Sequence, residues 1–241
     1  MNNKIYDIYN VLYKIYGQQG WWPLVHIEGE NANKLGNTSG YHVGNYNFPR
    51  NALEVFEVCL GAFLTQNTTF TSVVKSLHNL NSLNALSPRG IKSLPIDVFK
   101  TAIKPSGYYN QKAKYILGFI SFFENLEGTT PTREELLKVV GVGEETADSI
   151  LLYAYNEEEF VIDAYTKRVL ISLKIINDKT KYMEVKMMIQ SALETRVAQK
   201  KERIIMYQEY HALIVNHAKV FYSRKPYGIG CILQKSKPKL Y

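Results

Sequence analysis

The feature that most constrains this chain is a Gly-Val-Gly turn between two helical segments. The turn runs from Gly141 to Gly143, and the segment that begins at Glu144 carries apolar residues at helical spacing. Two glycines around one apolar residue allow the backbone to approach a ligand closely. The free N–H groups and the positive dipole end of the following helix favour a phosphate at the same place. The segment therefore predicts a backbone clamp for a phosphodiester.

An aspartate follows this turn, after the next helical segment and a short loop. Asp163 directly precedes a further predicted helix that begins at Ala164, so it can act as the N-cap of that helix. Its carboxylate can also stabilise the positive charge that builds up on a sugar when a glycosidic bond breaks. The residues alone leave both roles open.

These residues and three further blocks resemble the endonuclease III superfamily of helix-hairpin-helix DNA base-excision glycosylases. The blocks are LGAFLTQNT (60–68), IKPSGYYNQKA (103–113) and SRKPYGIGCIL (223–233), and they occur in the family's order. In that family the hairpin grips the DNA backbone and the aspartate assists cleavage of the N-glycosidic bond. The resemblance, which covers roughly residues 50–233, therefore implies that Asp163 is catalytic, whether or not it also caps a helix.

The hydrophobic pattern predicts an all-α protein. Residues 4–16 show the spacing of an amphipathic helix, residues 52–65 are apolar all round like a buried helix, and strand-like alternation is nearly absent. Residues 28–50 are rich in Gly and Asn and predict a long loop. Further helices are expected near 69–79, 109–125, 132–139, 144–155, 164–174, 182–198 and 203–222.

The resemblance implies one glycosylase unit over residues 1–241, built from two lobes with the DNA cleft between them. A central helical barrel is expected over 67–162, with the helix-hairpin-helix motif at about 132–155. The second lobe is expected to combine residues 1–66 with residues 163–241.

Composition agrees with a polyanionic partner. Lys and Arg number 29 against 22 Asp and Glu, a net charge of +7. Two cysteines give no disulfide framework, no apolar run is long enough to span a membrane, and the N-terminus lacks a signal peptide. We therefore expect an intracellular, cytoplasmic protein at the nucleoid, with no membrane partner. The resemblance implies a monomer that binds double-stranded DNA containing a damaged base.

The hairpin departs from the pattern of the bifunctional members. In those enzymes a lysine at the second position after Gly-x-Gly attacks the sugar, whereas this chain has Glu145. A carboxylate cannot form a Schiff base. The prediction is a monofunctional glycosylase without AP lyase activity, which uses water and leaves an abasic site. The alternative is that Lys167 or Lys219 supplies the amine.

The C-terminal tail also departs from the family. An iron–sulfur loop needs four cysteines, separated in this family by six, two and five residues. If Cys231 is the third, then Phe221, Gly228 and Lys237 occupy the other three positions. One thiolate cannot hold a cluster, so the sequence predicts no iron–sulfur cluster and no other cofactor.

No metal site is expected either. The five histidines do not show the spacing of metal ligands. Because family hairpins often bind a monovalent cation, the resemblance leaves one such site open at the carbonyl oxygens of Val140 and Val142.

Both tryptophans of the chain are adjacent, and a proline follows them. Trp21 and Trp22 can stack on a flipped, cationic base, or they can pack the N-terminal helix into the core. Together with the missing lysine and cluster, this Trp-Trp-Pro segment resembles the 3-methyladenine DNA glycosylase branch, sometimes called type III. That resemblance implies a base pocket of Trp21, Trp22 and Pro23, with Phe56 as the opposing ring and Phe48 as a weaker candidate.

The expected reaction is hydrolysis of the N-glycosidic bond of alkylated purines, chiefly 3-methyladenine, by base flipping and Asp-assisted water attack. Lys219 aligns with a lysine that reaches the pocket in this branch, although a solvated or DNA-facing lysine is an alternative. One competing hypothesis is a monofunctional glycosylase for mismatched thymine, uracil or 8-oxoguanine. Another is a non-catalytic helix-hairpin-helix DNA-binding protein.

Several residues are expected to contact DNA. In the family, the glutamine at Gln66 enters the gap left by the extruded nucleotide, although a helix C-cap is an alternative that Asn67 suits better. Lys112 is expected either to contact a phosphate or to lie on the Tyr108–Tyr109 turn. The remaining expected contacts come from the hairpin: Gly141, Val142, Gly143, Glu144 and Thr146.

Overall fold

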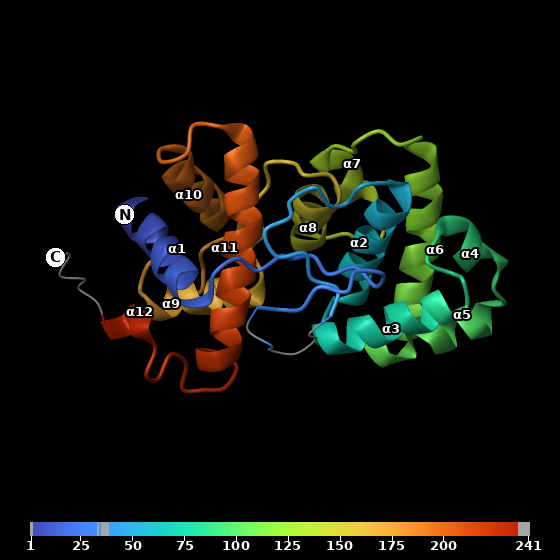
Figure 1. The fold of residues 1–241 in the computed structure, drawn as a ribbon, viewed down its shortest axis with the longest axis horizontal. Coiled ribbons are helices and arrows are strands. Elements are labelled where there is room, and N and C mark those ends of the chain that lie inside the picture. Colours follow the sequence, from blue (N-terminus) through green and yellow to red (C-terminus); the bar gives the residue numbers. More distant parts are fainter. Residues whose placement is uncertain (1, 33, 35–38, 236–241) are drawn as a thin grey trace. The chain divides into compact units, whose positions relative to one another are not determined.

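The computed structural model describes residues 2–32, 34 and 39–235, and it is built of helices and their connections (Figure 1). Within those residues, the only β pairing is an isolated bridge between Glu30 and Ser39. The all-α prediction is therefore confirmed. None of the described helices is both long enough and apolar enough to cross a membrane.

The chain forms two compact units. Unit 1 combines Met1–Trp21 with Glu158–Tyr241, and unit 2 is Trp22–Glu157. The expected joining of N- and C-terminal segments is present, but the boundary expected after residue 66 lies after residue 21. The reason is packing, because α2 (Ala52–Leu64) lies against α8 (Glu144–Ala154) and α6 (Tyr109–Asn125), both of which belong to unit 2.

Unit 2 is organised around α2. The side chain of Asn51 caps this helix by accepting hydrogen bonds from the N–H groups of Leu53 and Glu54. Apolar residues surround the helix, so it is buried against its neighbours rather than on one face only. The other helices of the unit are α3 (Phe70–Ser82), α4 (Pro88–Ser93), α5 (Ile96–Ile103), the 3₁₀ helix η1 (Lys104–Ser106), α6, α7 (Arg133–Lys138) and α8.

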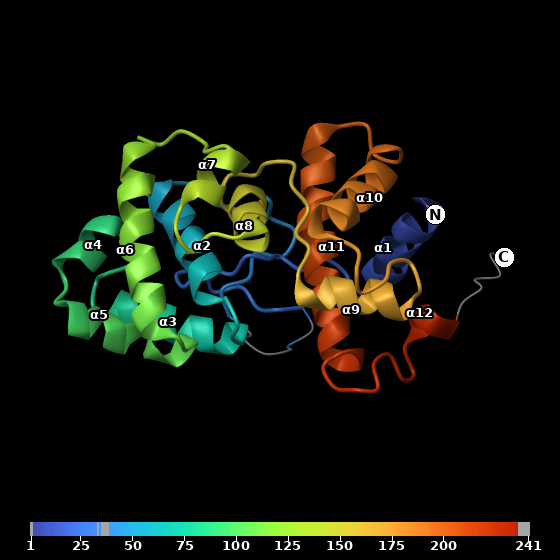
Figure 2. The same cartoon turned by 180° about the vertical axis from the view of Figure 1, so that it is seen from behind.

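Unit 1 is organised around α11 (Lys200–Phe221). Its partners are α1 (Asn2–Tyr16), which also packs on α10 (Tyr182–Glu194), and α9 (Ala164–Ser172), which lies against α11 (Figure 2). The short helix α12 (Ile232–Lys235) follows at the C-terminal end. In the core, the Tyr210 hydroxyl donates to the Ile5 carbonyl oxygen at 2.8 Å, which ties α11 to α1.

The helices α4, α5 and η1, which the pattern does not predict, lie in the proline-punctuated region. Pro88 is the first residue of α4, Pro95 is the N-cap of α5, and Pro105 lies within η1. Proline is tolerated at the start of a helix because the N–H group that it lacks has no intrahelical partner there. The prolines therefore begin these short helices rather than interrupt them.

Candidate active site

The Gly-Val-Gly turn joins α7 to α8 within unit 2, as the sequence predicts. Thr132 and Glu135 form a capping box at the start of α7. Arg133 joins the two helices, because its Nε atom lies 2.7 Å from Oδ1 of Asp148, a side chain with no solvent exposure. This buried ion pair fixes α7 against α8 and thereby fixes the turn between them.

The two glycines of the turn have different surroundings. Gly141 has a φ of +91°, and a Cβ there would lie 2.4 Å from ring carbons of Tyr115. Gly143 is the N-cap of α8 with a φ of −99°, and nothing lies within 4 Å of a Cβ placed on it. The structure therefore needs a glycine at position 141, whereas a Cβ at position 143 would enter open space.

The other predicted hairpin contacts differ in exposure. The Val140 side chain is 70% exposed, whereas those of Val142 and Thr146 are buried. Glu144 is half-buried in the first turn of α8. Val142 can therefore offer a ligand mainly its backbone. The cation expected on the carbonyls of Val140 and Val142 stays a prediction.

Gln66 lies against the hairpin in this structure. Its Nε2 donates to the carbonyl oxygen of Gly141 at 2.9 Å and to Oγ1 of Thr146 at 3.0 Å. The C-cap of α2 is Thr65, so neither Gln66 nor Asn67 takes that position. Insertion of Gln66 into DNA stays a prediction.

Lys112 requires a correction. The residue is 3% exposed, and its Nζ donates to the carbonyl oxygens of Leu64 and Ser106, each at 2.7 Å. Burial lowers the pKa of this ammonium group to about 8. Lys112 therefore binds the C-terminal end of α2 from inside unit 2, and its ammonium group is not available to a phosphate.

Phe56 also requires a correction. Its side chain has no solvent exposure, and its ring packs edge-on to that of Phe123 with the centroids 5.3 Å apart. It is a core residue between α2 and α6 rather than a ring open to a base. Phe48 is largely buried too, with Arg50 over its ring at 4.5 Å.

The two tryptophans belong to different units. Trp22 is 5% exposed in unit 2, where it packs edge-on to Phe70 at 5.6 Å and lies 5.4 Å from Tyr153. Pro23 beside it is also buried. Trp21 belongs to unit 1 and is half-buried. Of the pair, Trp22 has the core role that the sequence left open.

The backbone before Trp21 is held by a buried acid of α11. Glu209, 2% exposed, accepts hydrogen bonds from the N–H groups of Gln19 at 2.7 Å and Gly20 at 3.4 Å. The sequence did not single out Glu209, because an acidic residue within a long helix usually lies on a solvated face. Here it fixes the end of the N-terminal segment against α11.

Asp163 is the N-cap of α9, which confirms the first of its two possible roles. One carboxylate oxygen, Oδ1, accepts the N–H of Thr166 at 2.6 Å. The side chain is only 13% exposed, and its Oδ2 lies 3.8 Å from Nε2 of His211 on α11. Burial acts to raise the pKa of Asp163, but His211 and the Thr166 N–H outweigh it and hold the pKa below its usual value.

A second basic residue of α11 lies near this carboxylate. Burial lowers the pKa of Lys219, and the charge of Asp163 acts in the opposite direction. His211 and Lys219 are eight positions apart, which places them on one side of a helix. Lys219 was predicted from the resemblance. The sequence does not indicate a role for His211, because the spacing of the histidines shows no metal-ligand pattern and no local feature pairs His211 with Asp163.

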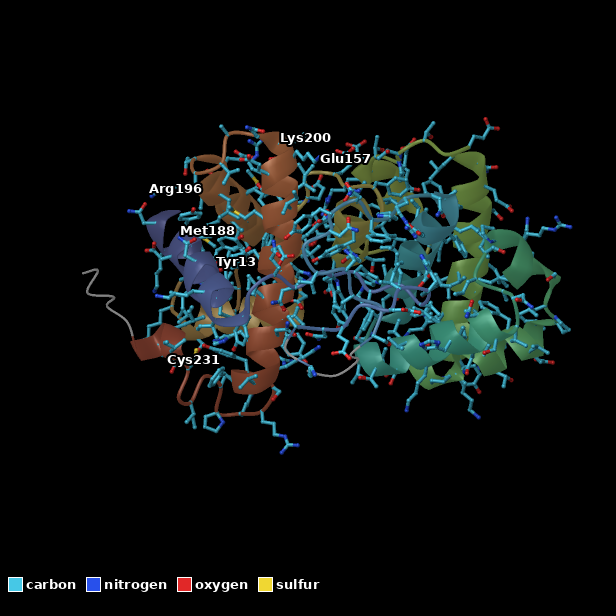
Figure 3. All side chains as sticks on the ribbon, viewed as in Figure 1. Tyr13, Glu157, Met188, Arg196, Lys200 and Cys231 are labelled. Carbon is cyan, nitrogen blue, oxygen red and sulfur yellow. The ribbon has the colours of Figure 1, made fainter. Side chains whose placement is uncertain are left out.

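The thiols do not fit an iron–sulfur cluster. Cys59 is buried on α2. Cys231 (Figure 3), directly before α12, is buried as well. Its Sγ lies 3.0 Å from Nε2 of His217 and 3.2 Å from the hydroxyl of Tyr222. In the described part of the chain, no three His, Cys, Asp or Glu side chains gather where they could hold a metal ion. The prediction that no cofactor is bound stays a prediction.

Comparison with known proteins places this hairpin and aspartate in a family. The sequence profile of the HhH-GPD superfamily of base excision DNA repair proteins matches residues 60–195, more than half of the chain. The chain belongs to this superfamily. Its general function is therefore base-excision DNA repair by a glycosylase of the helix-hairpin-helix type.

Relatives extend the similarity over nearly the whole chain. One relative is a Methanocaldococcus jannaschii protein that is provisionally named a DNA repair glycosylase. It is 36% identical over 96% of this chain and 94% of its own length. Endonuclease III of Sulfolobus acidocaldarius is 28% identical over 75% of this chain and 80% of its own.

Two solved structures are similar as well. The Helicobacter pylori 3-methyladenine DNA glycosylase bound to 1,N6-ethenoadenine is 30% identical, with a TM-score of 0.59, over 72% of this chain and 91% of that one. An endonuclease III–DNA complex has a TM-score of 0.69 over 98% of this chain and 94% of that one. At 19% identity, this second similarity shows the fold alone.

Proposed function

We propose that this protein is a monofunctional DNA glycosylase that removes alkylated purines, chiefly 3-methyladenine, from double-stranded DNA. The observation that carries the proposal is the Asp163 carboxylate, which is largely buried at the start of α9 and held in its charged form. A binding module needs no such carboxylate. A glycosylase needs one, because cleavage of the N-glycosidic bond leaves positive charge on the sugar.

The proposed mechanism gives Asp163 an electrostatic role. An alkylated adenine is cationic and leaves readily, so the enzyme needs little help from a general acid. The carboxylate stabilises the positively charged sugar as the base departs and orients the water that attacks it. Thr166 already fixes one carboxylate oxygen, so the charge is in place before the substrate binds.

Two features support an alkylated purine as the substrate. The first is the similarity to the H. pylori 3-methyladenine DNA glycosylase, whose identity to this chain is 30%. The second is Trp21, which is half-buried and next to a backbone fixed by Glu209. An indole ring is a strong stacking surface for a cationic base. We assign base stacking to Trp21.

The proposed absence of lyase activity rests on Glu145. It occupies an exposed position in the first turn of α8, where the bifunctional enzymes of this family carry the attacking lysine. A carboxylate forms no Schiff base with the sugar. We therefore propose that water is the nucleophile and that the DNA strand stays intact.

DNA binding is proposed to begin at the hairpin. Nothing lies within 4 Å of a Cβ placed on Gly143, and the N–H groups in the first turn of α8 favour a phosphate. The net charge of +7 attracts the DNA backbone over a longer range. In this proposal the protein acts as a monomer, without a metal or other cofactor.

The test is base release from a methylated duplex, with free bases separated by chromatography and the DNA strand checked for nicks. The proposal predicts free 3-methyladenine and an unbroken strand. Release of thymine, uracil or 8-oxoguanine from the corresponding duplexes, with no alkylated base released, would keep Asp163 as the catalytic group and overturn the assignment of the substrate.

The lyase prediction has a separate test. Borohydride added during turnover reduces a Schiff base to a stable protein–DNA adduct. The proposal predicts no adduct. An adduct that disappears in Lys219→Met or Lys167→Met would show that a lysine outside the hairpin supplies the amine.

A further inference from the structure

The carboxylate of Asp163 has a histidine beside it that the function proposed above does not use. His211 lies on α11, and its Nε2 is 3.8 Å from Oδ2 of Asp163. The other oxygen, Oδ1, accepts the N–H of Thr166 at 2.6 Å. The two oxygens thus face different groups, one from α9 itself and one from the helix that packs against it.

This arrangement meets a requirement of the reaction. A carboxylate that stabilises a cationic sugar must be ionised, and burial opposes ionisation. The side chains of Asp163 and His211 are only 13% and 9% exposed, so water can do little to stabilise the charge. The polar imidazole 3.8 Å from Oδ2 can take the place of that water.

Lys219 is the other basic group whose charge acts on this carboxylate, and it also lies on α11. The interaction between Lys219 and Asp163 is an electrostatic one. His211 is the basic side chain within 4 Å of an Asp163 oxygen. The geometry therefore favours His211 over Lys219 as the group that keeps the Asp163 carboxylate ionised and oriented.

We propose that His211 is a positioning residue that holds the Asp163 carboxylate in its charged form and correct orientation for cleavage of the N-glycosidic bond. The inference rests on the proposed function, because it requires Asp163 to be the catalytic carboxylate. It adds a residue from α11 whose effect on the reaction is transmitted through Asp163 rather than through the substrate.

The experiment measures single-turnover release of 3-methyladenine from a methylated duplex as a function of pH. His211→Leu removes the polar imidazole, whereas His211→Gln keeps an N–H donor without the ring. The acidic limb of the rate profile, where Asp163 takes up a proton, should move to higher pH by about one unit in His211→Leu, and by less in His211→Gln. The affinity for DNA should stay unchanged in both variants.

His217→Gln is the matched control. His217 is also buried on α11, but its ring contacts Cys231 and Tyr16 instead of Asp163. This variant should lose stability without moving the acidic limb. If the His211 variants lower the rate equally at every pH, as a loss of folded protein does, the inference is overturned. If His211→Leu does not fold, then His211→Gln carries the test, with its melting temperature measured alongside.

Failure of this inference can be distinguished from failure of the proposed function. If the wild-type protein releases no 3-methyladenine, the proposed function itself is wrong, and if Asp163→Asn keeps full excision, the catalytic role of Asp163 is wrong. If Asp163→Asn is inactive while folded His211 variants keep the wild-type pH profile, only the role of His211 is wrong.

Discussion

Two acidic side chains in this protein have opposite electrostatic surroundings. The pKa of Asp163 is held below its usual value, because His211 and the Thr166 N–H outweigh the effect of burial. The pKa of Glu57 on α2 is raised from 4.5 to about 7, chiefly by burial and also by Glu54, against the effect of the Val25 N–H. The first carboxyl stays ionised at neutral pH, whereas the second is about half protonated.

Glu57→Gln should therefore stabilise the protein in a pH-dependent way. Folded Glu57 keeps its proton up to about pH 7, whereas the unfolded chain releases it near 4.5, so wild-type stability falls as the pH rises through this window. The variant has no carboxyl group to titrate, so its stability does not fall in this way. Between about pH 5 and pH 8, its free energy of unfolding should rise by up to ~3 kcal/mol relative to that of the wild type. Urea unfolding at both pH values measures the difference. An equal difference at both values would show that the Glu57 carboxyl titrates normally.

The sequence predicted individual site residues unevenly. Asp163 and the hairpin glycines could be predicted, because a cap and a tight turn are local features. Phe56 and Lys112 were misplaced, since their burial depends on α6 and on the carbonyl end of α2, neither of which a local pattern contains. His211 could not be paired with Asp163 from the sequence, because only the packing of α9 on α11 brings them together.

The glycine within α2 has a packing explanation. Glycine inside a helix costs about 1 kcal/mol relative to alanine, so a reason for Gly61 is needed. A Cβ at this position would lie 2.9 Å from Nε1 of Trp22 and 3.1 Å from its Cζ2. Because Trp22 also packs on Phe70 and Tyr153, the ring has little room to move away.

Gly61→Ala should therefore lower the free energy of unfolding by ~1–3 kcal/mol, despite the better helix propensity of alanine. Gly118→Ala is the control, because nothing lies within 4 Å of a Cβ at that position in α6. The control should be stabilised by up to about 1 kcal/mol. Denaturant unfolding followed by tryptophan fluorescence measures both variants, and a stabilised Gly61→Ala would contradict the packing of Trp22 on α2.

The hairpin between α7 and α8 offers a second glycine comparison. Gly143→Ala should fold with a loss of no more than about 1 kcal/mol, because its Cβ enters open space. It should nevertheless weaken DNA binding, since the methyl group separates the start of α8 from a phosphate. Gly141→Ala should instead destabilise the hairpin itself, because of its positive φ and the Tyr115 ring. Melting temperatures and fluorescence anisotropy with a DNA duplex distinguish the two effects. Wild-type DNA affinity in Gly143→Ala would contradict the phosphate clamp.

Across the whole chain, the sequence predicts which long segments form helices. It does not predict which segments belong to the same unit. The long amphipathic and buried segments that predict α1, α2, α6, α8 and α11 all form helices. The division of the chain differs from the expected one, because residues 22–66 belong with the helices that surround α2. Membership of a unit depends on which buried faces meet, and periodicity alone does not carry that information.

The two units contain different parts of the proposed functional machinery. Unit 2 contains the hairpin, and unit 1 contains Asp163, His211, Lys219 and Trp21. DNA binding through the hairpin and chemistry at Asp163 should therefore be separable by mutation. A variant of unit 1 can lose excision while the hairpin of unit 2 still grips the DNA backbone.

Base excision by the Asp163→Asn variant tests the catalytic role of Asp163 most directly. Asparagine is also a good N-cap, so α9 should stay folded when the charge is lost. Single-turnover release of 3-methyladenine should fall by at least ~100-fold, the usual loss when a group that stabilises charge in the transition state is removed. Binding to the same duplex should persist. If the folded variant keeps wild-type excision, or loses DNA binding together with excision, the central role assigned to Asp163 is contradicted.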